Sequence, residues 1–339
     1  MVNVAILTGG TSAERLIALT SSQTVARVLN GRYATATFDF PSEIDAFLAR
    51  RHEFAVAIPV FHGKGGEDGT VQGFLETLGV PYLFSGVAAH AVAMDKDLAK
   101  RIVASAGVRT AAWTTCSSLG DRHIAKGSPR DPNRWVEQRN TVDVPKPCGS
   151  PSDPHAADAA CGEFPAVVKP LDGGSTQGVA IVRDRAELDA AVDAALRFSS
   201  RVIVEAFVAG DEFTVAVADV DGQPVAMPVI QIKSPTGLYD YDAKYGPTPA
   251  EKLCPAPIPD DLAQRLQSAA LAAHKAIGAK HLSRTDLIVD ASGDIWFLEI
   301  NTIPGLSVLF PRAVAASGRD FGDLLAQWIE STISNDPRH

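Results

Sequence analysis

The sequence contains few cysteines and no long hydrophobic run, and each absence excludes a class of protein. Its 339 residues include four cysteines, which have neither C-x-x-C spacing nor a histidine cluster beside them: Cys116, Cys148, Cys161 and Cys254. This spacing predicts reduced thiols rather than a zinc site or a disulfide framework. No run of about 18 apolar residues and no basic-then-apolar start is present, so we expect a cytoplasmic protein that does not associate with membranes.

Positive charge is also scarce. The chain carries 31 Lys and Arg residues against 40 Asp and Glu residues, which gives a formal net charge of −9. It contains no basic patch with interleaved aromatic residues, and this argues against a nucleic-acid partner. The composition, 46% hydrophobic and 21% charged, is typical of a globular protein, and the length allows two or three domains.

Two nucleotide-binding signatures are missing. Residues 2–8 predict a strand that ends in Gly9-Gly10, and residues 12–29 predict a helix, which together open an α/β sheet. No G-x-G-x-x-G follows this strand, which argues against a nicotinamide-linked dehydrogenase. The glycine-rich segment 172–178 lacks the Gly-Lys-Ser/Thr of a P-loop, although its backbone N–H groups could cradle phosphates.

Two polar residues follow predicted strands, and each has two interpretations. Thr11-x-x-Glu14 fits a helix capping box, but ligands of open α/β sheets also bind where Glu14 would lie, beyond the strand's carboxyl end. His62 opens the glycine-rich segment 62–69 after a predicted strand at 54–60. It is either a ligand-contacting residue or part of a plain surface loop.

The most informative stretch is residues 282–305, which predicts two strands joined by the turn residues 291–294. A four-residue loop pairs Asp290 with Ile295, and counting outward places Asp286 opposite Glu299. The same count places Arg284 opposite Asn301 on the same face. The other face is then predicted to hold Leu287, Val289, Trp296, Leu298 and Ile300.

This hairpin also has two interpretations. Two opposed carboxylates destabilise a sheet unless a cation lies between them, and such oxygen ligands suit Mg²⁺. The alternative is a surface hairpin in which Arg284 balances the acidic residues. A slip of one residue in the register would separate Asp286 from Glu299 and remove the metal site.

The remaining segments predict alternating strands and helices interrupted by two long loops. Further strands are predicted at residues 80–84, 165–170, 179–183, 201–205 and 212–220, and further helices at 85–107 with a break near 94–96, 187–196, 260–277 and 311–331. Residues 117–163 predict an irregular, proline-rich insertion. Residues 234–257 contain three tyrosines and a lysine between glycines and predict a lid over a site.

Several motifs stand in a characteristic order along the chain. They are Gly9-Gly10-Thr11-Ser12-Ala13-Glu14-Arg15, His62-Gly63-Lys64-Gly65-Gly66-Glu67-Asp68-Gly69, Met94-Asp95-Lys96, Val168-Lys169-Pro170 with Gly174-Ser175, Glu205, Tyr239-Asp240-Tyr241 to Lys244-Tyr245, Arg284-Thr285-Asp286, and Glu299-Ile300-Asn301-Thr302 with Pro304-Gly305. In this order they resemble the D-alanine–D-alanine ligases of the ATP-grasp superfamily. The resemblance covers nearly the whole chain outside residues 117–163.

The resemblance implies an α/β protein with the ATP-grasp fold, in which an N-terminal open α/β sheet precedes two α+β domains that clamp ATP. Residues 1–90 would form the N-terminal substrate-binding domain. Residues 91–208 would form the central domain, with the insertion at 117–163. Residues 209–339 would form the C-terminal catalytic domain, with the lid at 234–257.

The resemblance also implies the cofactors and their ligands. The ATP-binding residues would be Lys96, Lys169, Ser175, Glu205, Phe207, Glu212 and Lys244. Mg²⁺, most simply as a pair of ions and replaceable by Mn²⁺, would be held by Asp286, Glu299 and Asn301. The family often has a lysine after the adenine-binding glutamate, whereas this chain has Ala206.

The implied reaction phosphorylates the carboxylate of one D-alanine, and the amine of a second D-alanine then attacks the acyl phosphate. Glu14 would hold the first ammonium group and connect through Ser175 to Tyr245, and His62 would lie near the same substrate. Arg284 and the Gly305 N–H would stabilise the oxyanion. Ser307 would bind the carboxylate of the second D-alanine. The segment 306–310, which would bind the carboxylate of the second substrate, is shorter than in most family members, and Leu16 replaces a common acidic residue.

The resulting hypothesis is an ATP-dependent carboxylate–amine ligase that makes D-alanyl-D-alanine for peptidoglycan, and the resemblance also allows a homodimer. One alternative is a related ligase that makes a different D-amino-acid dipeptide. Another is a non-catalytic nucleotide-binding module, but a degenerate site would have lost some of the charged residues that this chain retains.

Overall fold

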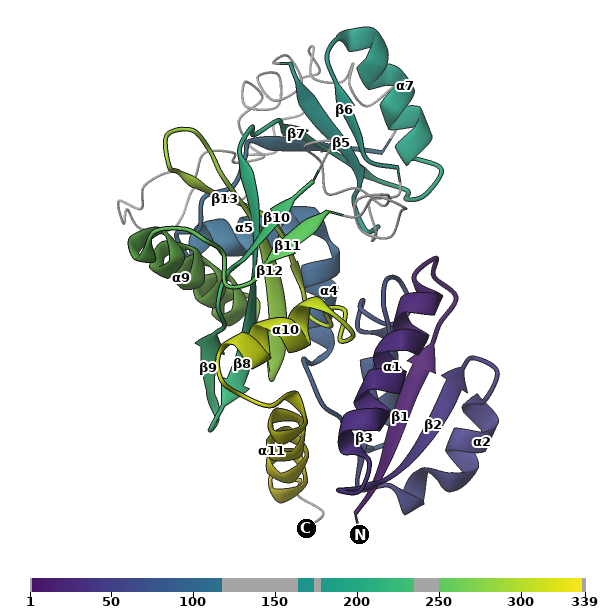
Figure 1. Cartoon of the computed structure of the whole chain (residues 1–339). Helices are drawn as coiled ribbons and strands as arrows, with labels where there is room; N and C mark the ends of the chain where they lie inside the picture. Colours follow the sequence, from purple (N-terminus) through teal and green to yellow (C-terminus); the bar gives the residue numbers. More distant parts are fainter. Residues whose placement is uncertain (1, 118–163, 174–177, 235–249, 337–339) are drawn as a thin grey trace, which may run out of the picture. The chain divides into compact units, whose positions relative to one another are not determined.

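The computed structural model describes residues 2–117, 164–173, 178–234 and 250–336 (Figure 1). The chain forms two compact units, and each is described separately. The first contains residues 1–110, 172–176 and 208–339, and the second contains residues 111–171 and 177–207. The predicted division into three domains stays a prediction.

The first unit begins with a parallel sheet of three strands in the order β2-β1-β3. The strands are β1 (Asn3–Gly9), β2 (Ala34–Phe40) and β3 (Val56–Pro59), and the helices are α1 (Arg15–Leu29), α2 (Ile44–Arg50) and α3 (Thr70–Thr77). Val4 and Ile6 of β1 pack with α1 on one face, whereas Ala5 and Leu7 pack with α2 and α3 on the other. Both faces of the sheet are therefore covered, as parallel sheets require.

The sequence pattern missed one strand near this sheet and predicted another that does not form. It did not predict β2, because Ala and Thr occupy four of its seven positions and leave only Phe38 and Phe40 buried. The strand predicted at residues 80–84 is a single bridge between Ala57 and Tyr82. The predicted open α/β unit itself is confirmed.

The same unit contains a six-stranded antiparallel sheet in the order β11-β10-β8-β12-β13, with β9 paired to β8. Its strands are β8 (Asp211–Val220), β9 (Gln223–Ala226), β10 (Ile230–Lys233), β11 (Glu251–Leu253), β12 (Leu282–Val289) and β13 (Ile295–Asn301). α5 (Lys96–Ser105) and α9 (Asp260–Ala276) supply Val103, Leu266 and Ala270 to the core over this sheet. The break predicted near residues 94–96 is confirmed, because α4 (Val87–Met94) ends where Asp95 caps α5.

The β12–β13 hairpin has the predicted register at the polar residues but not near the turn. Asp286 pairs with Glu299 and Arg284 pairs with Asn301, as predicted. Val289, not Asp290, pairs with Ile295, and an irregularity after Asp286 restores the register. Such a bulge inserts one extra residue into one strand and shifts its facing pattern.

The bulge also changes which residues of β13 reach the core. Phe297 pairs with Leu287 and is 1% exposed, so it fills the core position that was predicted for Trp296 and Leu298. The Trp296 ring instead lies beneath the Arg109 guanidinium and donates its N–H to Asp290. The predicted core positions of Leu287, Val289 and Ile300 are confirmed.

The C-terminal residues form two helices rather than the single helix predicted at 311–331. These are α10 (Leu309–Ala316) and α11 (Phe321–Ser334). Gly318, with φ +78°, separates them in a backbone conformation that favours glycine. Leu324, Leu325 and Trp328 of α11 pack in the core shared with β1 and α1, as predicted.

The second unit contains an antiparallel sheet in the order β4-β7-β5-β6. Its elements are β4 (Trp113–Cys116), β5 (Ala166–Pro170), β6 (Ala180–Val182), α7 (Arg185–Ala195) and β7 (Val202–Ala206). α7 begins after Asp184, whose carboxylate accepts the N–H of Glu187, and it buries Leu188 and Val192 against the sheet. The glycine-rich segment lies between β5 and β6, as predicted.

Two predicted loops can be compared with the structure only in part. Residues 118–163 of the predicted insertion and residues 235–249 of the predicted lid lie outside the described residues. The lid was predicted to extend to residue 257, but residues 251–253 form β11 and pair with β10. Among the helices that the structure describes, none is long and apolar enough to cross a membrane.

Candidate active site

A cavity of about 210 Å³ lies in the first unit, at the start of α1 and the end of β13. It brings together eight residues that the sequence singled out: Glu14, His62, Lys96, Arg284, Glu299, Asn301, Gly305 and Ser307. These residues come from four stretches of the chain, around residues 14, 62, 96 and 284–307, which are far apart in the sequence. The cavity therefore collects carboxylates, cations and backbone groups in one place.

The polar face of the β12–β13 hairpin supports a metal site. Asp286 is 5% exposed and receives hydrogen bonds from the Arg284 guanidinium at 3.0 and 3.1 Å and from the Thr214 hydroxyl at 2.6 Å. Glu299 lies opposite Asp286 in the register, and Asn301 lies two residues further along β13. A guanidinium therefore compensates the charge of one of the two opposed carboxylates.

The donor set fits Mg²⁺. Asn301 has a buried amide nitrogen with no hydrogen-bond partner among the described residues. Rotation of this amide by 180° exchanges its nitrogen for its oxygen, so the same position can present an oxygen ligand. Two carboxylates and an amide oxygen are hard ligands of the kind that Mg²⁺ takes. Among the described residues, no cluster of three or more His, Cys, Asp or Glu is present.

The predicted capping box at Glu14 does not form. α1 begins at Arg15, so Glu14 itself precedes the helix, and its side chain caps no backbone group. The Ser12 hydroxyl accepts the Glu14 N–H at 3.2 Å and donates to the His62 carbonyl at 2.6 Å. Glu14 Oε2 lies 2.7 Å from the point where a Cβ on Gly63 would be. The carboxylate of Glu14 is therefore held against the backbone of the glycine-rich loop.

Glu67 is a second carboxyl group at this loop, and the sequence patterns did not predict a role for it. It is 8% exposed, and its two oxygens accept the Gly63 N–H at 2.8 Å and the Ile303 N–H at 3.3 Å. Burial and then the nearby Glu14 raise the pKa of Glu67 to about 8. The position of Glu67 within the glycine-rich motif 62–69 could have indicated a functional residue. Residue spacing alone does not show that its side chain points toward the cavity.

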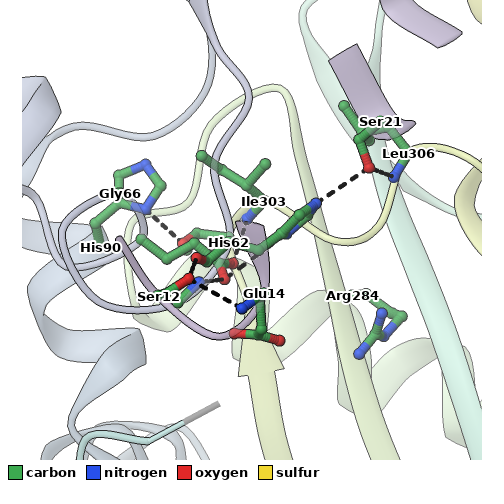
Figure 2. Close-up of polar contacts among 12 residues, drawn as sticks. Ser12, Glu14, Ser21, His62, Gly66, His90, Arg284, Ile303 and Leu306 are labelled. Carbon is green, nitrogen blue, oxygen red and sulfur yellow. Dashed lines mark hydrogen bonds and ion pairs between the residues drawn. The ribbon is translucent and has the colours of Figure 1, made fainter. Parts of the chain in front are cut away.

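His62 lines the cavity and is only 6% exposed, so it does not belong to a plain surface loop. Its Nε2 lies 3.1 Å from the Ser21 hydroxyl (Figure 2). Its Nδ1 lies 3.9 Å from Glu67 Oε2. Burial, and then the positive charge of Arg284, lower the pKa of His62 to about 4. The imidazole is therefore neutral at pH 7.

Two lysines line the cavity. Lys96 is the first residue of α5, is 9% exposed and donates from Nζ to the Gly173 carbonyl at 2.6 Å. Lys252, on β11, was not singled out by the sequence. Burial and then the neighbouring Arg312 lower the pKa of Lys252. Its ammonium forms no ion pair with any residue in the described part of the chain, so it could accept an anionic ligand.

The second unit holds other predicted nucleotide-binding residues. Lys169 on β5 and Glu205 on β7 form an ion pair at 2.7 Å, and Glu205 is 2% exposed. The Phe207 N–H donates to the Pro165 carbonyl just beyond β7. Glu212 lies on β8 of the first unit, paired with Ile288. Ser175, Lys244 and Tyr245 lie outside the described residues.

Two family models match the chain. The model described as D-ala D-ala ligase C-terminus matches residues 150–330, and the one described as D-ala D-ala ligase N-terminus matches residues 31–85. Among individual relatives, the chain is 36% identical to a D-alanine–D-alanine ligase from Syntrophobacter fumaroxidans, with 98% of each chain covered. It is 35% identical to another from Moorella thermoacetica, with 98% of this chain and 99% of that protein covered.

Solved structures with the same fold include a D-alanine–D-alanine ligase from Bacillus anthracis complexed with ATP. It has a TM-score of 0.75 and 26% identity, and the match covers 100% of this chain and 99% of that one. A D-Ala:D-Ser ligase from Enterococcus faecalis gives a TM-score of 0.77 and 25% identity, with 98% and 99% covered. The predicted fold class, an N-terminal open α/β sheet followed by α+β units of the ATP-grasp type, is confirmed.

Proposed function

Because this chain belongs to the D-alanine–D-alanine ligase family, we propose that it joins two D-alanines to D-alanyl-D-alanine at the expense of ATP. The product serves peptidoglycan precursor synthesis. The observation that carries the proposal is the cavity that unites Glu14, Arg284 and Gly305 with the acidic end of the β12–β13 hairpin. A zwitterionic amino acid and a phosphate need such paired positive and negative groups.

The proposed reaction has two steps. A carboxylate oxygen of the first D-alanine attacks the γ-phosphorus of ATP, ADP leaves, and an acyl phosphate forms. The amine of the second D-alanine then attacks the acyl carbon, loses a proton and expels inorganic phosphate. Both steps create or move negative charge, so fixed hydrogen-bond donors near the acyl group accelerate them.

Glu14 would bind the ammonium group of the first D-alanine. Its position against Gly63 supports this role, because the loop holds the carboxylate at the cavity. The neutral state of His62, whose pKa is lowered to about 4, is compatible with a bound ammonium group beside it. The link from Glu14 through Ser175 to Tyr245 in the lid stays a prediction.

Arg284 and the Gly305 N–H would stabilise the developing oxyanion. Both line the cavity, and Arg284 is anchored by its hydrogen bonds to Asp286. The second carboxylate would contact Ser307, and Lys252 is a cation that lines the same cavity. Lys252 can thus supply a charge to this carboxylate despite the short segment 306–310.

Asp286, Glu299 and Asn301 would hold Mg²⁺, for which Mn²⁺ can substitute. When bound, the metal would neutralise phosphate charge during transfer. Lys96 and Lys169 would contact the phosphates, and Lys244 would assist phosphoryl transfer. Glu205 and the backbone around Phe207 would bind adenine, and Glu212 would bind the ribose.

One assay tests the proposal directly. ADP release and product mass are measured with ATP, Mg²⁺ and a panel of D- and L-amino acids. D-alanine alone should give ADP, phosphate and D-alanyl-D-alanine. If no amino acid causes ADP release, the ligase function is refuted and the chain is better described as a non-catalytic nucleotide-binding module.

A second candidate function keeps the first D-alanine and changes the second amino acid. The short segment 306–310 and Lys252 at the cavity favour it, since both alter the surroundings of the second carboxylate. Adding D-serine or D-lactate to D-alanine in the same assay separates the two, because mixed products would then exceed D-alanyl-D-alanine. We also propose a cytoplasmic location, where ATP is supplied, and a homodimer, which light scattering can test.

A further inference from the structure

The loop between β13 and α10 carries the groups proposed to act on the acyl carbon and the second substrate. Gly305 and Ser307 line the cavity. Leu306, which lies between them, and Ile303, two residues before Gly305, are both 0% exposed. Buried backbone groups need hydrogen-bond partners. The partners of this loop come from the N-terminal residues of the chain rather than from its own neighbours.

Two of these partners are side chains of the N-terminal residues. The Ile303 N–H donates to Glu67 at 3.3 Å, and the Leu306 N–H donates to the Ser21 hydroxyl at 3.2 Å. The Ser21 hydroxyl also lies 3.1 Å from His62 Nε2, so it stands between the histidine and the loop (Figure 2). Ser21 is 0% exposed, so no water reaches it.

The single hydrogen of the Ser21 hydroxyl decides the state of His62. A backbone N–H can only donate, so the serine oxygen accepts from Leu306. The serine hydrogen is then available to His62 Nε2, and this hydrogen is paired when Nε2 accepts it. His62 therefore carries its own proton on Nδ1, since its pKa of about 4 keeps it neutral.

The surroundings of the other ring nitrogen agree with this tautomer. The imidazole also hydrogen-bonds to the backbone of Ile303, in a contact that favours its protonated form and so has the ring N–H as donor. Glu67 Oε2 lies 3.9 Å from Nδ1. The opposite tautomer would leave the serine hydrogen without an acceptor, and unsatisfied buried polar groups are costly.

We propose that Ser21 is a positioning residue for the ligation step. It fixes the Nδ1–H tautomer of His62 and holds the Leu306 backbone, and His62 holds Ile303. These contacts bracket Gly305 and so set the position of its N–H relative to the acyl carbon. The inference rests on the proposed function, because it assigns Ser21 a purpose only if the cavity performs the ligation.

The kinetic test compares Ser21→Ala with Ser22→Ala. Ser22 is the adjacent buried serine on α1, and its hydroxyl donates only to Leu19 of the same helix. Alanine favours helix at both positions, so α1 should remain intact. Ser21→Ala should lower kcat about 10- to 100-fold, as expected for lost buried hydrogen bonds. The KM values for ATP and for the first D-alanine should change less than twofold, and Ser22→Ala should behave as wild type.

The spectroscopic test reads the tautomer of His62. The ¹⁵N NMR signals of His62 are identified as those that disappear in His62→Gln. In the wild-type chain, these signals should show a protonated Nδ1 and an unprotonated Nε2. In Ser21→Ala these signals should shift toward the Nε2–H form, whereas Ser21→Thr, which retains the hydroxyl, should restore both the tautomer and kcat. A structural role alone would not change the tautomer.

Two results would overturn the inference. Equal kcat in the Ser21→Ala and Ser22→Ala proteins, with wild-type ligation intact, would show that Ser21 does not position the loop. An Nε2–H tautomer in the wild type would refute the hydrogen assignment. A wild-type chain that makes no dipeptide from any amino acid would instead refute the proposed function, and the inference with it.

Discussion

Gly63 provides a sharp test of the position of Glu14. Its φ is +74°, and a Cβ there would lie 2.7 Å from Glu14 Oε2 and 3.1 Å from the Ser12 hydroxyl. Both distances are shorter than ordinary contacts of a methyl group. Gly63→Ala must therefore displace Glu14, or Ser12, which fixes the Glu14 backbone.

Gly65 offers a matched control in the same loop. Its φ is +87°, but a Cβ there would meet no atom within 4 Å. An alanine in either position carries the same left-handed strain, about 1–2 kcal/mol. Only Gly63→Ala adds the displacement of Glu14, whose charge-assisted hydrogen bond to an ammonium group would contribute about 1.5–3 kcal/mol.

The expected kinetic difference follows from these values. Gly63→Ala should raise the KM for the first D-alanine about 10- to 100-fold relative to Gly65→Ala, with similar melting temperatures for the two proteins. Steady-state rates of ADP release at varied D-alanine concentration give this ratio. Equal KM values in the two variants would refute the placement of the ammonium site at Glu14.

Three further predictions follow from the site. Glu299→Gln should abolish ADP formation and lower Mn²⁺ affinity, measured by electron paramagnetic resonance, in a protein that unfolds at the wild-type temperature. The pKa of Glu67 is raised from 4.5 to about 8, so its folded state binds more protons than the unfolded state between these values. Wild-type stability relative to Glu67→Gln should thus fall as pH rises from 5 to 9, and a constant difference in melting temperature would contradict this. Lys252→Ala should raise the KM for the second D-alanine about tenfold or more, and Ser307→Ala should raise the same KM. Neither variant should change the KM for the first D-alanine. If the KM for the second D-alanine is unchanged in one of these variants, the replaced side chain does not bind the second carboxylate.

The polar face of the hairpin was predictable because side chains of a strand alternate between faces. Counting from the turn gave the correct pairing of Asp286 with Glu299. The count succeeded although the turn pairing was wrong, because the bulge after Asp286 compensates for the longer turn. Bulges depend on tertiary packing, here the entry of Phe297 into the core, and local residue patterns do not reveal them.

The residues behind the cavity could not be predicted from local patterns. Ser21 lies within a helical segment whose apolar neighbours give it no distinguishing feature, and its partner Leu306 is 285 residues away in the chain. Glu67 and Lys252 belong to the glycine-rich segment 62–69 and to the predicted lid, and no local pattern indicated that these two side chains line the cavity. Family motifs identified the groups proposed to touch substrate, whereas the groups that hold them in place emerged only from the folded chain.

The most direct test of the proposed chemistry follows the carboxylate oxygens of D-alanine. With both oxygens labelled as ¹⁸O, an acyl phosphate requires that one label leave with inorganic phosphate and that the remaining label stay in the new peptide bond. Mass spectrometry of the phosphate and of the dipeptide reads both products. We predict singly labelled phosphate together with ADP. Unlabelled phosphate, or label transferred to AMP with release of pyrophosphate, would contradict the account.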